Sequence, residues 1–277
     1  MHSTSSMSWF GRVSLGGGLA FLYLPIVVLV VYSFNASKLV SVWAGFSLGW
    51  YQTLFDDEAV MAAFGLSLKV AVLASAMSVV LGTLAGLVMA RFGPFRGKSL
   101  FAGMLTAPMV MPEVITGLSM LLLFVSMQQW LGFPEERGVL TIWVGHVTLC
   151  TAYVTVVIRS RLVEMDRSLE EAAMDLGARP LKIFFVITLP LILPAIASGF
   201  LLSFTLSLDD LVMTAFLSGP GSTTLPQLIF SRVRLGLNPE INALGTLTVL
   251  VVAVLVISAN RIMLRQEKRR AALAAAS

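Results

Sequence analysis

The chain has 277 residues, of which 57% are hydrophobic and only 12% are charged. Soluble domains carry about 25% charged residues, so this chain has too few to cover a water-facing surface of its size. A soluble enzyme and a disordered or fibrous chain are therefore excluded, and the composition predicts an all-α polytopic membrane protein. The net charge of +4 does not indicate a nucleic-acid partner, because the Lys and Arg residues cluster between apolar runs.

Six apolar runs are long enough to cross a bilayer, which takes about 20 helical residues. They are residues 13–33, 66–90, 100–126, 139–158, 189–217 and 241–261. The third and fifth runs contain proline pairs, Pro108 with Pro112 and Pro190 with Pro194, which predict kinks or breaks. No small-residue cleavage site follows the first run, so we interpret it as a span and not as a signal peptide.

The positions of Lys and Arg predict the orientation of the spans. One side of the six-span arrangement holds 14 of these residues and the other side holds four, with Lys69 just inside the second span. The richer side consists of Arg12, Arg91, Arg96, Lys98, Arg159, Arg161, Arg167, Arg179, Lys182, Arg261, Arg265, Lys268, Arg269 and Arg270. Because basic residues accumulate in the cytoplasm, both termini are predicted to be cytoplasmic.

Two local patterns predict architecture. Gly82 and Gly86 are spaced four residues apart in the second run, which favours close helix packing. Asn238, Pro239 and Glu240 are typical of a helix start, with a capping residue, a proline at the first position and an acid in the first turn.

The sequence contains no pattern for enzymatic chemistry. Residues 93–99 resemble a phosphate-binding loop, but three residues separate the glycines where four are needed, and no strand precedes them. His2 and His146 lie far apart, so we predict no metal site, and His146 is interpreted as a hydrogen-bonding residue between helices. Cys150 is interpreted as a small core residue. No cofactor is predicted for this chain.

The inner loop 159–188 carries the sharpest signal. Residues 169–176 favour a helix, Gly177 can end it in a left-handed conformation, and Pro180 can begin a second one. The loop therefore predicts a short, kinked helical pair at the membrane surface. On these residues alone, a surface helix without a partner is an equal alternative.

The spacing within this loop resembles a known family. Glu171-Ala172-Ala173, Gly177, Ile187 and Leu189-Pro190 fit the pattern E-A-A-x3-G-x9-I-x-L-P. This resembles the signature loop of the permease subunits of binding-protein-dependent ABC importers. The resemblance implies the type I importer permease fold with six transmembrane helices, one permease domain over 1–277, and a coupling loop over 159–190. The residues that it places at the ATPase contact are Glu171, Ala172, Ala173, Asp175 and Gly177.

The resemblance extends over nearly the whole chain and is greatest to the polyamine branch of that family, especially putrescine permeases. The segments that carry it are 43–46, 111–115, 207–212, 218–221 and 238–243. It implies a location in the bacterial inner membrane and four kinds of partner: an ATPase pair that holds the ATP and magnesium, a second, non-identical permease, a periplasmic polyamine-binding protein, and lipid.

Three acidic residues within apolar runs indicate a cation path. Charge inside a bilayer costs about 2.5–3.5 kcal/mol per group, so Glu113, Asp209 and Asp210 must face water, a partner or a cation. On a continuous helix Asp210 shares a polar stripe with Ser203, Ser207 and Thr214, whereas Asp209 is turned about 100° away. Trp43 adds an aromatic face for a cation–π contact. The residues of the predicted path are Trp43, Glu113, Ser207, Asp209 and Asp210.

Each of these interpretations has an alternative. The aspartate pair can be a helix end satisfied by loop amides or by Arg232 or Arg234, Glu113 can form a subunit-interface salt bridge, and Trp43 can be an interfacial residue. The same architecture also fits an importer of spermidine or of an oxyanion. A proton-driven transporter fits the acids but has no need of the coupling loop, and no residue constellation supports a membrane-embedded enzyme.

Overall fold

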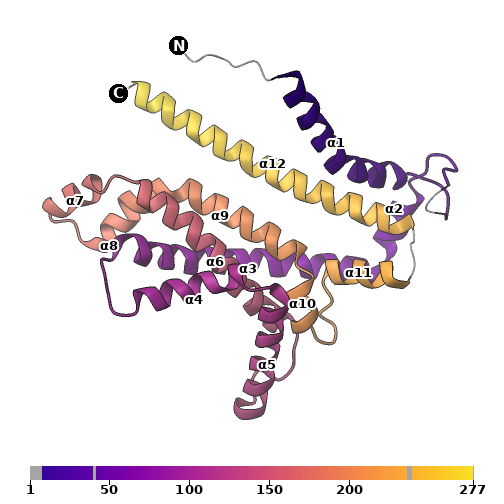
Figure 1. Cartoon of the computed structure of the whole chain (residues 1–277), viewed down its shortest axis with the longest axis horizontal. Coiled ribbons are helices and arrows are strands. Elements are labelled where there is room, and N and C mark those ends of the chain that lie inside the picture. Colours follow the sequence, from indigo (N-terminus) through magenta and orange to yellow (C-terminus); the bar gives the residue numbers. More distant parts are fainter. Residues whose placement is uncertain (1–7, 40–41, 236–238, 277) are drawn as a thin grey trace. The chain divides into compact units, whose positions relative to one another are not determined.

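A computed structural model describes residues 8–39, 42–235 and 239–276 (Figure 1), with side chains left out for 259, 260 and 262–276. Helices dominate these ranges, and an isolated bridge joins Asn35 to Phe46. The elements are α1 (Trp9–Tyr32), α2 (Gly49–Asp56), α3 (Glu58–Arg91), α4 (Lys98–Val110), α5 (Glu113–Leu131), α6 (Val139–Glu164), α7 (Ser168–Asp175), α8 (Pro180–Ile183), the π-helix η1 (Phe184–Thr188), α9 (Leu189–Asp209), α10 (Val212–Leu217), α11 (Leu225–Leu235) and α12 (Pro239–Ala276).

Within the described ranges, six helical segments are long and apolar enough to cross a membrane, which confirms the predicted number of spans. They are Trp9–Tyr32, Glu58–Arg91, Glu113–Leu131, Val139–Glu164, Pro180–Asp209 and Pro239–Ser258. The last begins at Pro239 with Glu240 in its first turn, as predicted, while the expected capping residue Asn238 lies outside the described residues.

The third apolar run, 100–126, is broken at one of its two prolines, as predicted. It is divided into α4 and α5 at Met111 and Pro112, both of which have extended backbone. The helical conformation is disfavoured for a residue that precedes a proline, as Met111 does. Proline also has no amide hydrogen to donate, so α4 ends at Val110. Pro108 lies within α4 and does not end it. The helix that is long enough to span is therefore α5.

The fifth run, 189–217, is also divided, but not at its prolines. Pro190 lies at the start of α9, directly after the π-helix η1, Pro194 lies within α9, and the helical backbone continues past both. The backbone instead becomes extended at Asp210, and α10 follows as a separate short helix. The expectation of one continuous helix through Asp210 is therefore wrong.

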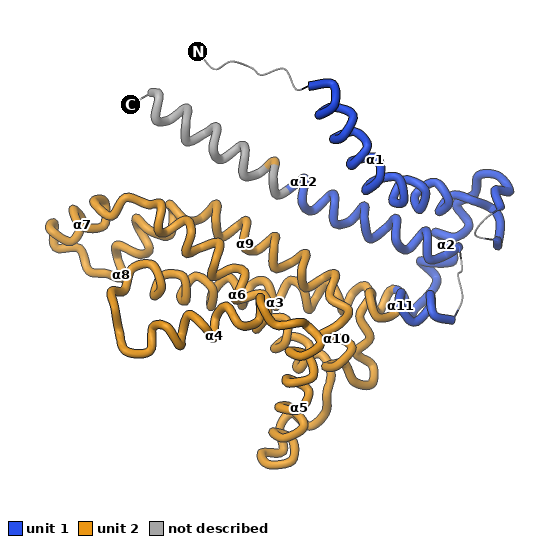
Figure 2. The backbone as a smooth tube through the Cα atoms, in the orientation of Figure 1, with its two compact units in different colours: residues 1–60, 229–258 blue, residues 61–228, 259–277 orange. Residues whose placement is uncertain are grey.

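The contacts divide the chain into two compact units (Figure 2). Unit 1 consists of residues 1–60 and 229–258, and unit 2 of residues 61–228 and 259–277. The single permease domain over 1–277 stays a prediction.

Polar contacts organise unit 1. Asn35 accepts the amides of Ser37 and Ala44 on its side-chain oxygen, which shapes the loop after α1. Arg232 on α11 pairs with Asp57, at 2.5 Å, and with Glu240, at 3.0 Å. Hydrogen bonding to the Arg232 guanidinium holds the pKa of the Asp57 carboxyl below its usual value. These ion pairs tie the start of α3 to α11 and α12.

Helix α6 forms the centre of unit 2. Two clusters of buried apolar residues include side chains of α6, among them Ile142 and Leu149 in one and Val154 and Ile158 in the other. Val154 packs against two glycines, Gly82 of α3 and Gly199 of α9. The close packing predicted for Gly82 and Gly86 is confirmed, because a Cβ atom at either position would crowd α6.

We predict that Gly82→Ala destabilises the protein by about 1–3 kcal/mol, because its Cβ would lie 2.6 Å from a Val154 methyl group. Gly65→Ala is the matched control on the same helix, since a Cβ there meets nothing within 4 Å. Thermal unfolding in detergent measures both variants. An equal melting temperature for the two would show that α3 and α6 are not in close contact.

Candidate functional site: an acidic helix break and a coupling helix

Asp210 caps the helix that follows the break in the fifth run. Its carboxylate accepts the backbone amides of Met213, at 3.2 Å, and Thr214, at 2.8 Å, which are among the free amides at the start of α10. The Thr214 hydroxyl donates to the same carboxylate at 2.8 Å. Aspartate is a favoured residue for this capping role. The break is therefore stabilised by its own side chain.

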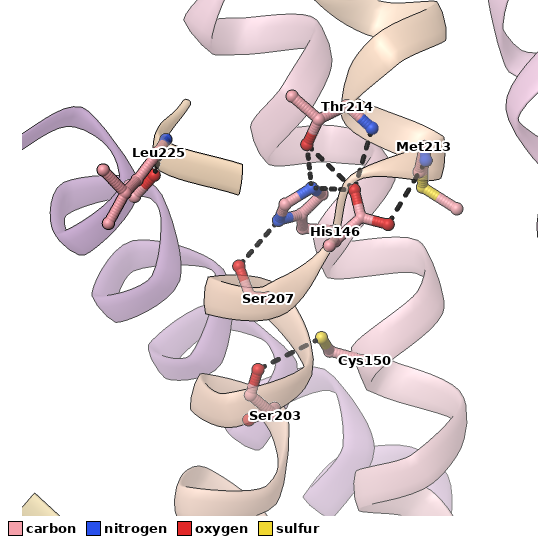
Figure 3. Close-up of polar contacts among 9 residues, drawn as sticks. His146, Cys150, Ser203, Ser207, Met213, Thr214 and Leu225 are labelled. Atoms are coloured by element: carbon pink, nitrogen blue, oxygen red, sulfur yellow. Dashed lines mark hydrogen bonds and ion pairs between the residues drawn. The ribbon is translucent and has the colours of Figure 1, made fainter. Parts of the chain in front are cut away.

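His146 of α6 joins the two sides of this break (Figure 3). Its Nδ1 atom lies 2.6 Å from the Ser207 hydroxyl in the last turns of α9, and its Nε2 atom lies 3.0 Å from the Thr214 hydroxyl and 3.1 Å from Asp210. The Thr214 hydroxyl has one proton, which it donates to Asp210. Its oxygen can therefore only accept from His146, so Nε2 of His146 carries a proton. The interpretation of His146 as a hydrogen-bonding residue between helices is confirmed.

Burial separates the two adjacent aspartates. Asp210 is 8% exposed and Ser207 is 6% exposed, and both face His146, which is 1% exposed. Asp209, one residue earlier, is exposed, and its carboxylate has no hydrogen bond or ion pair with any residue that the structure describes. The polar stripe predicted for Ser203, Ser207, Asp210 and Thr214 thus faces the protein, and Asp210 matches the alternative of a helix end satisfied by amides.

Sequence reasoning did not place His146 beside the acids, because 64 residues separate it from Asp210. A usable signal existed, since a titratable residue in an apolar run is expected to have a polar partner. Cys150 is buried as predicted, one turn further along α6, and its thiol faces the Ser203 carbonyl at 3.5 Å.

Glu113 lies in the first turn of α5, directly after the break at Pro112. Its side chain is exposed, and within the described residues it has no ion pair or hydrogen bond. One turn later, Gly117 of α5 packs against the Phe216 ring of α10, so α5 and α10 are in contact. Glu113 and Asp209 are therefore both free carboxylates next to helix breaks of unit 2.

Trp43 lies in the loop between α1 and α2 of unit 1. Its ring is 49% exposed and meets the ring of Tyr32 edge-on, with the centroids 6.1 Å apart. An exposed indole face remains available for a cation or for a membrane interface.

The coupling residues lie on α7 and at its end. Glu171, Ala172 and Asp175 are exposed, and Ala173 is half-buried. Gly177 has φ = +80°, its amide bonds to Met174, and the amide of Ala178 bonds to the carbonyl of Ala173. This is the glycine-terminated helix end that the sequence predicts. A second helix, α8, begins at Pro180, also as predicted.

No three His, Cys, Asp or Glu side chains gather as metal ligands anywhere in the described ranges. The site thus offers two kinds of chemistry. The exposed carboxylates can bind a cation, and the exposed face of α7 can contact another protein.

The chain is similar to known transport proteins. Residues 82–272 match the family described as "Binding-protein-dependent transport system inner membrane component". The putrescine transport system permease protein PotI of Escherichia coli K12 is 62% identical over 91% of this chain and 90% of its own length. The spermidine/putrescine transport system permease protein PotC of the same strain is 38% identical over 91% of this chain and 94% of its own.

Solved structures show the same fold. A chain of the bacterial alginate ABC transporter in complex with its alginate-bound periplasmic protein aligns with a TM-score of 0.69, 18% identity and 92% coverage of both chains. An inward-facing MetNI methionine ABC transporter chain aligns with a TM-score of 0.62 at 18% identity, over 74% of this chain and 97% of its own. From its family match and these relatives, the chain belongs to the inner membrane components of binding-protein-dependent transport systems.

Proposed function

We propose that this chain is one permease subunit of an ATP-driven importer that moves a polyamine, putrescine first, from periplasm to cytoplasm by alternating access. The observation that carries the proposal is the similarity to the Escherichia coli putrescine permease over nine-tenths of the chain. PotC, a spermidine/putrescine permease, is more distant, which favours putrescine over spermidine.

The exposed acids suit this substrate. Putrescine carries two ammonium groups on an apolar spacer, and carboxylates stabilise such groups by charge-assisted hydrogen bonds. Asp209 and Glu113 are free to bind a cation in the structure. Binding must stay weak, because a site that holds the ion tightly does not release it. Trp43 is a further candidate for cation–π contact.

Asp210 and Ser207 act differently in this proposal. Both are buried and hydrogen-bonded, so their role is to hold the break that presents Asp209. The alternative of proton carriage by Glu113 and Asp210 is separated from this proposal by whether uptake depends on the ATPase.

The remaining subunits complete the transporter. We infer that the exposed face of α7 docks on a separate ATPase pair that holds ATP and magnesium, and that a second, non-identical permease supplies the other half of the path. A periplasmic polyamine-binding protein delivers the substrate to the outer loops. The distribution of Lys and Arg supports cytoplasmic termini, and this chain itself has no ATP site.

We predict that this chain restores saturable uptake of labelled putrescine in cells that lack their own putrescine permease but hold the other subunits. Excess unlabelled putrescine should compete more strongly than equal spermidine, and an oxyanion such as sulfate should not compete. Uptake should stop when the ATPase is removed with the proton gradient intact. Uptake that persists without the ATPase would favour the proton-driven alternative.

We predict that changing Asp209 affects transport, whereas changing Asp210 affects the stability of the protein. Asp209→Asn should raise the KM for putrescine about tenfold or more, because a charge-assisted contact is lost, with an unchanged melting temperature. Asp210→Ala should lower the free energy of unfolding by about 2 kcal/mol or more, because it removes the cap and the carboxylate that contacts His146 and Thr214.

Asp210→Asn is the matched control for the cap, since asparagine caps helices as well as aspartate does. Asp210→Asn should lower the free energy of unfolding less than Asp210→Ala does. Thermal unfolding and uptake kinetics at equal protein levels measure these effects. A normal melting temperature for Asp210→Ala would overturn the capping role.

A further inference from the structure

The end of α3 and the coupling helix α7 are joined by a buried ion pair. Arg91, the last residue of α3, places Nε 2.8 Å and Nη2 3.2 Å from the two oxygens of Glu170. Its Nη1 atom donates to the Leu162 carbonyl of α6 at 2.8 Å. The two side chains are only 11% and 13% exposed. One arginine thus connects α3, α6 and α7.

Glu170 also contacts the segment that leads into α9. The hydroxyl of Thr188, which is 2% exposed, donates to Glu170 at 2.8 Å. Thr188 is the last residue of η1, and α9 begins at the next residue. π-Helical turns are frequent at functional positions within helices. The Glu170 carboxylate therefore lies between the end of one membrane helix and the start of another.

Polar contacts connect α7 to the membrane helices. No residue of α7 is fully buried, and Glu170 is its most enclosed polar side chain in these contacts. An open cleft of about 160 Å³ lies beside Glu170 and Arg91, with mostly apolar walls that include Leu87, Phe92 and Met174. At the start of α7, Arg167 adds a hydrogen bond to the Ala90 carbonyl at 2.7 Å. Movement of α7 can therefore pass to the membrane helices through these side chains as well as through the connecting backbone.

The neighbouring acid faces the other way. Glu171 is exposed, and its carboxylate has no partner among the residues that the structure describes. Successive residues of a helix are turned by about 100°, so one acid of the pair can face the protein while the other faces outward. The two carboxylates are thereby suited to different tasks.

We propose that Arg91, Glu170 and Thr188 form a transmission link that passes movement of the coupling helix α7 to α3 and α9. We assign them as positioning residues, because they bond to one another and to α6. The inference rests on the proposed function, since it requires a separate ATPase that moves α7. It differs from the docking role of Glu171, because docking holds the ATPase on α7, whereas the link carries the movement of α7 into the membrane helices.

The test uses the complete transporter in lipid vesicles, with putrescine uptake and ATP hydrolysis measured together. Glu170→Gln keeps the shape of the side chain but loses its charge, and Thr188→Val removes one hydroxyl. Each should leave the ATPase bound at its normal level and lower the putrescine imported per ATP about fivefold or more. Glu171→Gln is the adjacent control and should instead weaken retention of the ATPase.

A charge exchange gives a second, independent readout. Arg91→Glu and Glu170→Arg should each lower the uptake per ATP, and the double variant should recover part of it, because opposite charges face one another again. Glu164→Gln is the control, because Glu164 pairs with Arg161 on an exposed surface. This variant should leave the putrescine imported per ATP unchanged.

Two results would overturn the link. One is a normal uptake per ATP in both Glu170→Gln and Thr188→Val, and the other is loss of the ATPase from Glu170→Gln to the same degree as from Glu171→Gln. Failure of the proposed function looks different, because then the natural sequence itself shows no ATP-dependent putrescine uptake.

Discussion

A helix that breaks within a membrane exposes backbone groups that lipid cannot satisfy, and the acid site depends on how this constraint is met. Each unsatisfied amide in hydrocarbon costs several kcal/mol. The break between α9 and α10 is stabilised because Asp210 accepts two amides of α10 and His146 bonds to residues on both sides. The same break leaves Asp209 exposed. One acid thus satisfies the backbone, and its neighbour stays free for a ligand.

The sequence predicted the spans more reliably than their breaks, because a span is a local property of about 20 residues. The break after α4 also had a local signal in Pro112. The break at Asp210 had only the weak local signal of a capping aspartate, since its other partner, His146, lies 64 positions away. The prolines of the same run do not mark this break, because the helical backbone continues past Pro190 and Pro194.

The roles of the acidic residues could likewise be predicted only in part from the sequence. Two of the adjacent acidic pairs carry the proposed roles, Asp209 with Asp210 and Glu170 with Glu171, and their charge was evident from the sequence. Which member of each pair faces the protein was not, because the deciding partner lies 64 residues away in one case and 79 in the other. From the sequence alone, Arg91 is only one of the basic residues predicted on the inner side of the membrane. Its role in holding Glu170 requires the folded packing of α3 against α7.

Helix α9 connects these two acidic pairs. It begins directly after Thr188, which contacts Glu170, and ends at Asp209, so its 21 residues span about 30 Å. The helical backbone continues along α9 although Pro194 removes one internal hydrogen bond, so a displacement at Thr188 can be carried to the break. Beyond the break, α10 is fixed by the fully buried Met213 and Leu217. In the proposed transporter, a shift of α9 would change the direction of Asp209 more than it moves α10, and would thereby couple the end of the helix beside α7 to its acidic end.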